Sequence, residues 1–197
     1  MDSDTSSASL VRRALFLVAS ARRDGNTEQL ARAAAESLPA GTEQRWLHLD
    51  DYPLAPFRDF RHDVGTYPVP VGNEGVLADA TLWATDLVMC APLYWYSVPA
   101  SAKLYLDYWS GWMRVPGMEF KRRMSGRRLW LISMFSDEDP RMMEPLLGTM
   151  RLCADYLAME WCGALVGYGS RPGDVQKDAT VLAKARTFFS GALTSAR

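Results

Sequence analysis

The sequence predicts a doubly wound α/β fold, in which five parallel strands in the order 2-1-3-4-5 carry helices on both faces. Short apolar segments alternate with longer amphipathic ones from residue 12 onward, which is the pattern of repeated β-α units. Strand segments such as Leu87–Ala91 are apolar throughout, because helices cover both faces of a parallel sheet. In such a fold the ligand lies where the strand order reverses, at the carboxyl ends of strands one and three.

Each β-α unit begins with an apolar segment of strand length. The predicted strands are Ala14–Ala19, Glu43–Leu49, Leu87–Ala91, Arg128–Met134 and Ala164–Tyr168. Helices are expected near Thr27–Leu38, Asn73–Trp83, Pro99–Met113, Pro145–Trp161 and Asp174–Leu193. The fourth of these helices has an apolar stripe at helical spacing, formed by Leu146, Met150, Cys153, Ala154, Leu157 and Trp161.

Length and composition indicate an ordinary globular protein. The chain has 197 residues, of which 48% are hydrophobic and 23% charged, so a flexible tail over residues 1–11 and a single domain over 12–197 are expected. A net charge of -1 gives no general attraction to nucleic acid. No apolar run reaches the length of a membrane span and the N-terminus lacks signal-peptide features, so a cytoplasmic protein is expected.

The cysteines and histidines do not form a metal-binding pattern. Cys90, Cys153 and Cys162 are widely spaced among apolar residues and are expected to be small core residues. His48 and His62 have no ligand pattern near them, so no metal site is predicted.

The loop over residues 20–27 has the layout of a phosphate-binding site. Its sequence, Ser-Ala-Arg-Arg-Asp-Gly-Asn-Thr, follows the first strand and opens the first helix. Unpaired N–H groups at a helix N-terminus favour an anion, and glycine tolerates the positive φ of a sharp turn. The alternative is an ordinary Asn/Thr helix cap after an Asp-Gly turn. Side chains that could bind the phosphate are Ser20, Arg22, Asn26 and Thr27.

The loop over residues 91–99 follows the third strand and carries three adjacent aromatic side chains, Tyr94, Trp95 and Tyr96. Pro92 and Pro99 stiffen its ends, and Ser97 could cap the helix that follows. Free backbone N–H groups and aromatic faces suit a flat, hydrogen-bonding ring. The alternative is that these aromatics pack against the next helix or another subunit.

Together the two loops suit flavin mononucleotide (FMN), which has a phosphate at one end and a flat heterocycle at the other. Here the sequence resembles the flavodoxin-like NAD(P)H-dependent flavin, azo and quinone reductases. The first motif of that family is matched by Ser20, Arg22, Gly25, Asn26, Thr27 and Leu30. The second is matched by Pro92, Leu93, Tyr94, Trp95, Tyr96, Ser97, Pro99, Ala100 and Lys103.

The resemblance implies a set of cofactor contacts. Ser20, Arg22, Asn26 and Thr27 would contact the FMN phosphate, and Pro92, Leu93, Tyr94 and Trp95 would border the ring. Ser97 would contact a ribityl or ring oxygen. A third loop over residues 133–137 would supply Ser133 and Phe135, and the segment 169–173 would either approach the site or merely turn the chain.

The resemblance also implies an FMN-dependent oxidoreductase that passes a hydride from NADH or NADPH to a quinone, azo, nitro or flavin acceptor, with no catalytic side chain. The alternative is a flavodoxin-type electron carrier or a flavin-binding regulatory subunit. The near-neutral charge and Arg22-Arg23 in the first loop favour the reductase. Arg22 could instead receive the adenosine phosphate of NADPH. The Gly-x-Gly-x-x-Gly and Gly-Lys-Ser/Thr patterns of other nucleotide-binding folds are absent, as is a cysteine in the phosphate loop.

Two further segments are relevant to assembly. The segment Asp50–Val71 is rich in proline and aromatic residues and is expected to be a lid or a subunit-contacting arm. Trp109 and Trp112 lie in the third helix and are expected in the core or at a subunit interface. These two segments motivate the expectation of a homodimer. Lys103 and Asp107, four residues apart, are expected to form an exposed ion pair.

Overall fold

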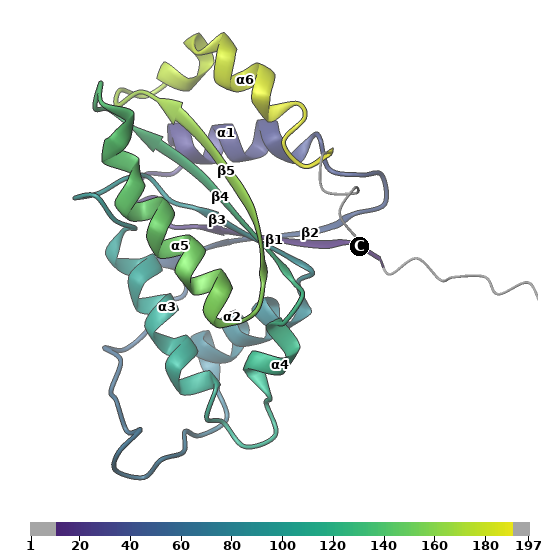
Figure 1. Ribbon diagram of the computed structural model, residues 1–197, viewed down its shortest axis with the longest axis vertical. Helices are drawn as coiled ribbons and strands as arrows, with labels where there is room; N and C mark the ends of the chain where they lie inside the picture. Colours follow the sequence, from purple (N-terminus) through teal and green to yellow (C-terminus); the bar gives the residue numbers. More distant parts are fainter. Residues whose placement is uncertain (1–10, 191–197) are drawn as a thin grey trace, which may run out of the picture.

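The computed structural model describes residues 11–190, and within them the predicted sheet is confirmed (Figure 1). All neighbouring strands pair in parallel, in the order β2-β1-β3-β4-β5. The tail expected over residues 1–11 lies outside the described residues except for Val11. The strands are β1 (Arg13–Val18), β2 (Glu43–His48), β3 (Asp86–Cys90), β4 (Arg128–Phe135) and β5 (Glu160–Tyr168).

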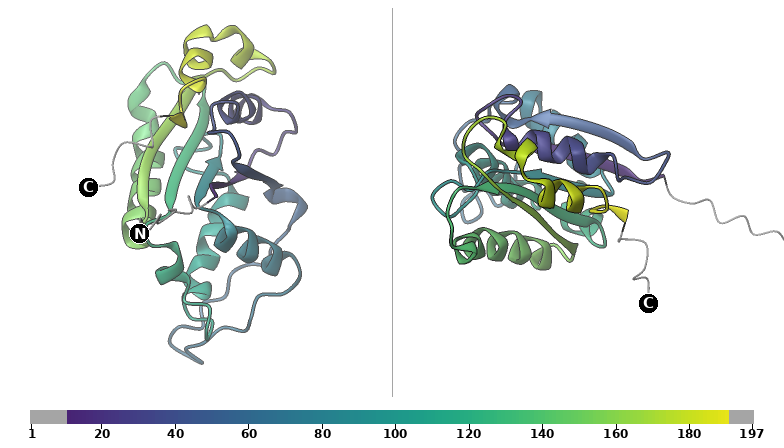
Figure 2. Two further views of the ribbon diagram at one scale, coloured as in Figure 1. Left: turned by 90° about the vertical axis from the view of Figure 1, so that its right-hand side faces the viewer. Right: turned by 90° about the horizontal axis from the view of Figure 1, so that it is seen from above.

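Helices cover both faces of the sheet, as Figures 1 and 2 show. On one face lie α1 (Asn26–Ala35) and α6 (Ala179–Ala185). On the other lie α2 (Gly72–Trp83), α3 (Ala100–Trp112) and α5 (Glu144–Tyr156), with the short α4 (Phe120–Met124) beside them. Single turns of 3-10 helix are formed by η1 (Leu49–Asp51), η2 (Pro140–Met143) and η3 (Asp174–Lys177).

The sheet separates two hydrophobic cores, and alternate residues of each strand enter opposite ones. In β1, Leu15 and Leu17 pack on the α2, α3 and α5 side, whereas Phe16 and Val18 pack on the α1 and α6 side. All four side chains are buried. The strands are therefore apolar throughout because each successive side chain enters one core or the other.

Two predicted helices differ from those in the structure. The fourth stops at Tyr156, and Ala158 takes a left-handed φ of 53° that turns the chain into β5. Trp161, expected on the helical stripe, therefore lies in β5. The helix predicted over Asp174–Leu193 is divided into η3 and α6 because the Asp178 carboxylate accepts the N–H of Val181 and starts a new helix. Its end at Leu193 lies outside the described residues.

The aromatic side chains of α3 belong to the core of their own chain. Trp109 and Trp112 are buried, and Phe120 of α4 packs against both rings. No element was predicted in the segment that contains α4. The Trp112 indole donates a hydrogen bond to Glu74 of α2 at 2.9 Å. The core interpretation of these tryptophans is therefore confirmed.

The segment 50–71 packs along the same helix. The Tyr108 hydroxyl donates to the carbonyl of Ala55 at 3.0 Å, and the Tyr67 and Phe57 rings are stacked. They lie against Gly111, where an added Cβ would come within 3.0 Å of the Tyr67 ring. A glycine at this point of α3 lets the segment approach the helix backbone.

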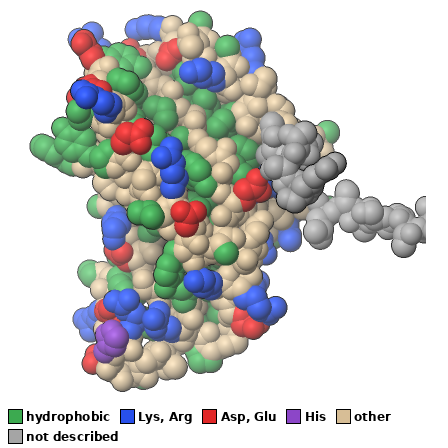
Figure 3. Space-filling model, viewed as in Figure 1, with side chains coloured by type: hydrophobic (Ala, Val, Ile, Leu, Met, Phe, Trp, Pro, Cys, Tyr) green, Lys and Arg blue, Asp and Glu red, His purple; other side chains and the backbone are tan. Residues whose placement is uncertain are grey.

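No helix within residues 11–190 is long and apolar enough to cross a membrane. On the face shown in Figure 3, acidic and basic side chains are interspersed. The exposed pair expected between Lys103 and Asp107 is present.

A buried ion cluster joins the amino ends of the strands. Asp86 opens β3 with a fully buried side chain and accepts hydrogen bonds from Arg12 and Arg128, each at 2.8 Å. It also accepts from the indole N–H of Trp130 at 3.0 Å. Burial alone would raise the pKa of Asp86, but the hydrogen bond and charge of Arg12 and the charge of Arg128 outweigh it, so the pKa lies below its ordinary value.

Replacing this carboxylate tests the cluster. We expect Asp86→Ala to lower the free energy of unfolding by about 3–5 kcal/mol, because it leaves two guanidinium groups without their buried partner. Asp107→Ala, which removes an exposed carboxylate, is expected to change it by about 0.3–0.5 kcal/mol. Urea unfolding of both variants measures the difference, and equal losses would contradict the assignment.

The same cluster predicts the acid dependence. Because the pKa of Asp86 is depressed in the folded state, its contribution is complete above the unfolded value of about 3.9 and is lost as the pH falls through the folded value. The stability difference between the wild type and Asp86→Ala should therefore shrink below about pH 4. A difference that stays constant down to pH 2 would be inconsistent with a carboxylate in this role.

Candidate functional site

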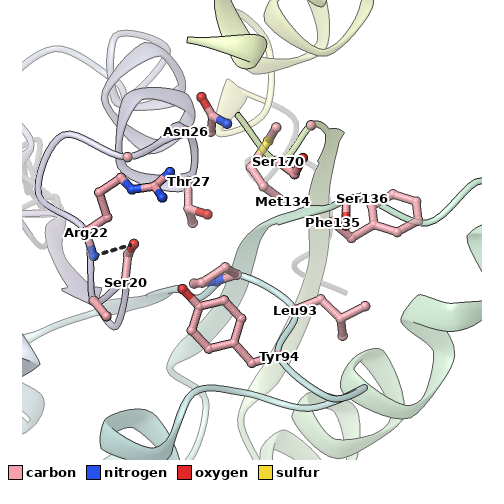
Figure 4. Close-up of a pocket in the computed structure, with 14 residues that line it drawn as sticks. Ser20, Arg22, Asn26, Thr27, Leu93, Tyr94, Met134, Phe135, Ser136 and Ser170 are labelled. Atoms are coloured by element: carbon pink, nitrogen blue, oxygen red, sulfur yellow. Dashed lines mark hydrogen bonds between the residues drawn. The ribbon is translucent and has the colours of Figure 1, made fainter. Parts of the chain in front are cut away.

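A pocket of about 410 Å³ opens at the carboxyl ends of the strands, where the strand order reverses (Figure 4). Loops after β1, β3, β4 and β5 surround it. They contribute Ser20, Ala21, Arg22, Gly25, Asn26, Thr27, Pro92, Leu93, Tyr94, Met134, Phe135, Ser136, Gly169 and Ser170.

Most residues predicted for the site lie in this pocket. From the first loop these are Ser20, Arg22, Asn26 and Thr27, and from the others Pro92, Leu93, Tyr94 and Phe135. Three predicted residues do not line it. Trp95 borders a neighbouring pocket, Ser97 closes a turn, and Ser133 is fully buried in β4.

The first loop turns at Asp24 rather than at the glycine. Asp24 has a left-handed φ of 51°, whereas Gly25 is extended with φ −69° and ψ 166°. The expectation that Gly25 supplies a positive φ is therefore wrong. Gly25 is instead a point of close approach, because an added Cβ would lie 3.2 Å from the carbonyl oxygen of Arg22 and 3.4 Å from the Ser20 hydroxyl.

The start of α1 leaves hydrogen-bond donors available at the pocket. No side chain caps this helix. Within residues 11–190, the backbone N–H groups of Asn26 and Thr27 donate no hydrogen bond. In the same range the guanidinium of Arg22 has no carboxylate or carbonyl partner, and its side chain extends toward Thr27 (Figure 4). This end of the pocket therefore presents N–H and guanidinium donors of the kind that bind anions in proteins.

The side chain of Asn26 is committed to another loop. Its amide donates to the carbonyl of Arg171 at 2.8 Å, and its oxygen accepts the N–H of Gly173 at 3.0 Å. Asn26 therefore joins the loops after β1 and β5 and offers the pocket its backbone N–H. Of the two alternatives for segment 169–173, the structure supports an approach to the site, because Gly169 and Ser170 line the pocket.

The aromatic loop after β3 is a tight turn. Tyr94 and Ser97 exchange backbone hydrogen bonds at 3.0 Å, and between them Trp95 and Tyr96 have φ values of 49° and 62°. This combination is that of a type I′ turn, which normally selects Asn and Gly. Trp95 is 93% exposed. Ser97 is occupied in the turn, and α3 begins at Ala100 with Pro99 as its N-cap, so the cap predicted for Ser97 is wrong.

A smaller pocket of about 170 Å³ lies beside this turn. It shares Leu93 and Ser136 with the main pocket and is also lined by Trp95, Tyr96, Asp137 and Met142. The exposed aromatic turn therefore borders the end of the site opposite the free N–H donors.

The sequence analysis did not name five of the residues that line the pocket, which are Ala21, Met134, Ser136, Gly169 and Ser170. Met134 and Ser136 belong to the third loop that was expected. The signal for Gly169 and Ser170 was their position directly after the fifth strand, since carboxyl ends of parallel strands meet at one edge of the sheet.

The thiols and the histidines do not form a second site. Burial raises the pKa values of Cys90, Cys153 and Cys162, so these thiols remain protonated at neutral pH. No group of His, Cys, Asp and Glu that could hold a metal ion is found among the described residues.

The fold and the pocket at its strand-order reversal define a flavodoxin-like class of protein. The chain belongs to the family described as "Flavodoxin-like fold", whose model matches residues 12–188. The resemblance inferred from the two loop motifs is thus confirmed at the level of the family.

Individual relatives are similar along most of their length. "Putative NAD(P)H-dependent FMN-containing oxidoreductase YwqN" of Bacillus subtilis (strain 168) is 28% identical over 83% of this chain and 89% of its own. The structure of the Trp repressor binding protein from Bacillus subtilis matches with a TM-score of 0.70 at 24% identity, covering 90% of this chain and 97% of that one. The NAD(P)H:quinone oxidoreductase from Methanothermobacter marburgensis matches at 0.69 and 17%, covering 95% and 100%. The two structural matches establish the common fold.

The link made by Asn26 can be tested directly. We expect Asn26→Ala to lower the free energy of unfolding by about 0.5–1.5 kcal/mol, because it removes the partner of two partly buried backbone groups of the β5 loop. Hydrogen exchange at the Gly173 amide should become faster. Asn26→Asp retains the acceptor for that amide and should preserve its protection. Unchanged exchange in Asn26→Ala would refute the link.

The strain of the aromatic turn gives another prediction. Replacing Trp95 and Tyr96 by Asn and Gly should raise the free energy of unfolding by about 1–2 kcal/mol, because these residues adopt positive φ at lower cost. The double alanine variant keeps two L-residues with side chains at positive φ and serves as the control. Urea unfolding measures both. A loss of stability in the Asn-Gly variant would mean that ring packing outweighs the strain.

Proposed function

We propose that this protein is an FMN-dependent NAD(P)H oxidoreductase that reduces a small acceptor of the quinone, azo, nitro or flavin class. The observation that carries the proposal is the polarity of the main pocket, with unpaired cationic and N–H donors at one end and an apolar, aromatic loop at the other. Family membership and the named activity of the relative from Bacillus subtilis support it. When bound, FMN would supply the hydride chemistry at its N5 atom.

In this proposal the loop after β1 binds the phosphate. The backbone N–H groups of Asn26 and Thr27 lie in the first turn of α1, where the helix dipole favours negative charge. The hydroxyls of Ser20 and Thr27 and the guanidinium of Arg22 line the same part of the pocket and add charge-assisted hydrogen bonds.

The other loops hold the flat ring and exclude water. Pro92, Leu93 and Tyr94 would border one side of the ring, and Phe135 would lie at the loop after β4. Trp95 would contact the ring or the acceptor from the neighbouring pocket. Because the acceptor and the nicotinamide need only an open face of the ring, no side chain is assigned as an acid or base.

The competing proposal is a non-enzymatic electron carrier. A near-neutral chain with a net charge of -1 lacks the strong acidity that such carriers tend to use for docking to a reductase. The exposed Trp95 beside the pocket also favours a small aromatic partner over a protein surface that recognises charge.

Turnover without a partner separates the two functions. The purified protein, loaded with FMN, should oxidise NADH or NADPH at a rate that rises with the concentration of an added quinone. A carrier would need a separate reductase and would show negligible turnover. The relative rates with NADH and NADPH identify the preferred nucleotide.

The phosphate assignment of Arg22 gives a sharper prediction. We expect Arg22→Ala to weaken FMN binding about tenfold or more, since a hydrogen bond to a charged group contributes about 1.5–3 kcal/mol. Riboflavin, which lacks the phosphate, should bind equally to variant and wild type. Arg23→Ala is the matched control, because Arg23 pairs with Asp51 outside the pocket. A raised KM for NADPH with unchanged FMN affinity would instead assign Arg22 to the nucleotide phosphate.

We also propose that the protein acts in the cytoplasm as a homodimer. The segment 50–71 exposes several valines, among them Val64, Val69 and Val71, which another subunit would cover. Light scattering at micromolar concentration tests the oligomeric state, and the mass of a monomer would contradict the homodimer.

A further inference from the structure

A buried carboxylate lies directly beneath the loop that offers its N–H groups to the pocket. Glu28 belongs to the first turn of α1, and its side chain is only 2% exposed. A negative charge so close to an anion-binding loop needs an explanation, because it would repel the anion unless it is neutralised. Glu28 does not itself line the pocket.

Both oxygens of Glu28 are occupied. Oε1 accepts hydrogen bonds from Arg32 Nε at 3.2 Å and Nη2 at 2.6 Å, and it lies 3.3 Å from His48 Nε2. Oε2 accepts the backbone N–H of Asp24 at 3.1 Å. Burial alone would raise the pKa of Glu28, but the hydrogen bonds from Arg32 and Asp24 outweigh it and lower the pKa, so the group stays ionised.

The cation that faces Glu28 is itself fixed in place. The guanidinium of Arg32 lies 4.6 Å from the centre of the Trp46 ring, which stacks on Phe16 of β1 at 3.9 Å. The Glu28 carboxylate is therefore paired with Arg32, a side chain that packs against aromatic residues of the sheet.

The hydrogen bonds around Glu28 fix the backbone of Asp24. Its N–H is bound by Glu28, and its carbonyl oxygen accepts from Gln29 Nε2 at 2.6 Å. Asp24 has a left-handed φ of 51°, which is unfavourable for a residue with a side chain. Both backbone groups of Asp24 are thus bonded to α1, which fixes the direction of the chain after this residue. Gly25 is then extended, and the N–H groups of Asn26 and Thr27 remain unpaired.

We propose that Glu28 is a positioning residue for the cofactor phosphate, which acts by holding Asp24 so that the N–H groups at the start of α1 converge on the anion. This inference rests on the proposed function. Glu28 touches neither the phosphate nor the ring. Its charge is neutralised by Arg32, and its effect on the phosphate passes through the backbone of the loop.

A simpler role for Glu28 would be stability alone, because Glu28 and Arg32 are also a helical pair four residues apart. The two roles differ in which ligands they affect. Loss of stability weakens every ligand of the pocket equally, whereas loss of positioning weakens only a ligand that carries the phosphate. The ratio of FMN to riboflavin affinity therefore separates them.

The experiment compares Glu28→Met with Glu28→Gln. Methionine fills similar volume but removes the acceptor, and glutamine keeps a carbonyl oxygen for the Asp24 N–H. We expect Glu28→Met to weaken FMN binding at least tenfold and riboflavin binding less than twofold. Glu28→Gln should retain most of the wild-type FMN affinity. Hydrogen exchange at the Asp24 amide should accelerate at least tenfold in Glu28→Met and remain close to wild type in Glu28→Gln.

Two controls complete the test. Glu36→Ala removes an exposed glutamate from the other end of α1 and should change neither affinity. Glu28→Ala also removes the acceptor for the Asp24 N–H, but it adds no large side chain. It is used in place of Glu28→Met if Glu28→Met does not fold. Equal weakening of FMN and riboflavin in Glu28→Met, or an unchanged FMN affinity, would overturn the positioning role. A wild-type protein that binds neither flavin would overturn the proposed function itself.

Discussion

The reversal of strand order at β1 is the constraint on which the rest of the structure depends. From β1 the chain runs outward to β2 and then returns to β3 on the other side of β1. Because parallel crossovers are right-handed, α1 and α2 must then cover opposite faces of the sheet. The loops after β1 and β3 therefore diverge, and the space between them becomes the pocket.

Within that pocket, the important distinction is between backbone groups that are occupied and those that are left available. The backbone N–H and carbonyl of Asp24 are bonded to side chains of α1, and the side-chain amide of Asn26 is bonded to the loop after β5. The N–H groups of Asn26 and Thr27 have no such partner among the described residues. A loop that is rigid in its own contacts can present unpaired donors without losing them to internal hydrogen bonds.

The sheet, its strand order and the two principal loops could be predicted from local patterns. Strands that are apolar throughout and helices with apolar stripes are properties of short segments, as is the composition of loop 20–27. The errors in helix bounds occurred where an apolar pattern with helical spacing continues past the residue at which the helix ends or is divided. Trp161 continues the helical stripe of α5, yet the left-handed Ala158 ends the helix before it. Asp178 similarly divides a continuous helical pattern by capping Val181.

By itself the sequence determined the α/β class, the strand order, the position of the pocket between the loops after the first and third strands, and most of the residues that line it. Only the tertiary structure decided that Asp24 rather than Gly25 turns the loop, that the Asn26 side chain binds the β5 loop, and that Ser97 and Ser133 lie outside the pocket. The physical reason is that periodicity and composition depend on neighbours along the chain. The direction of a side chain and the partner of a buried polar group depend on segments that folding brings together, such as Glu28 and His48 or Asn26 and Gly173.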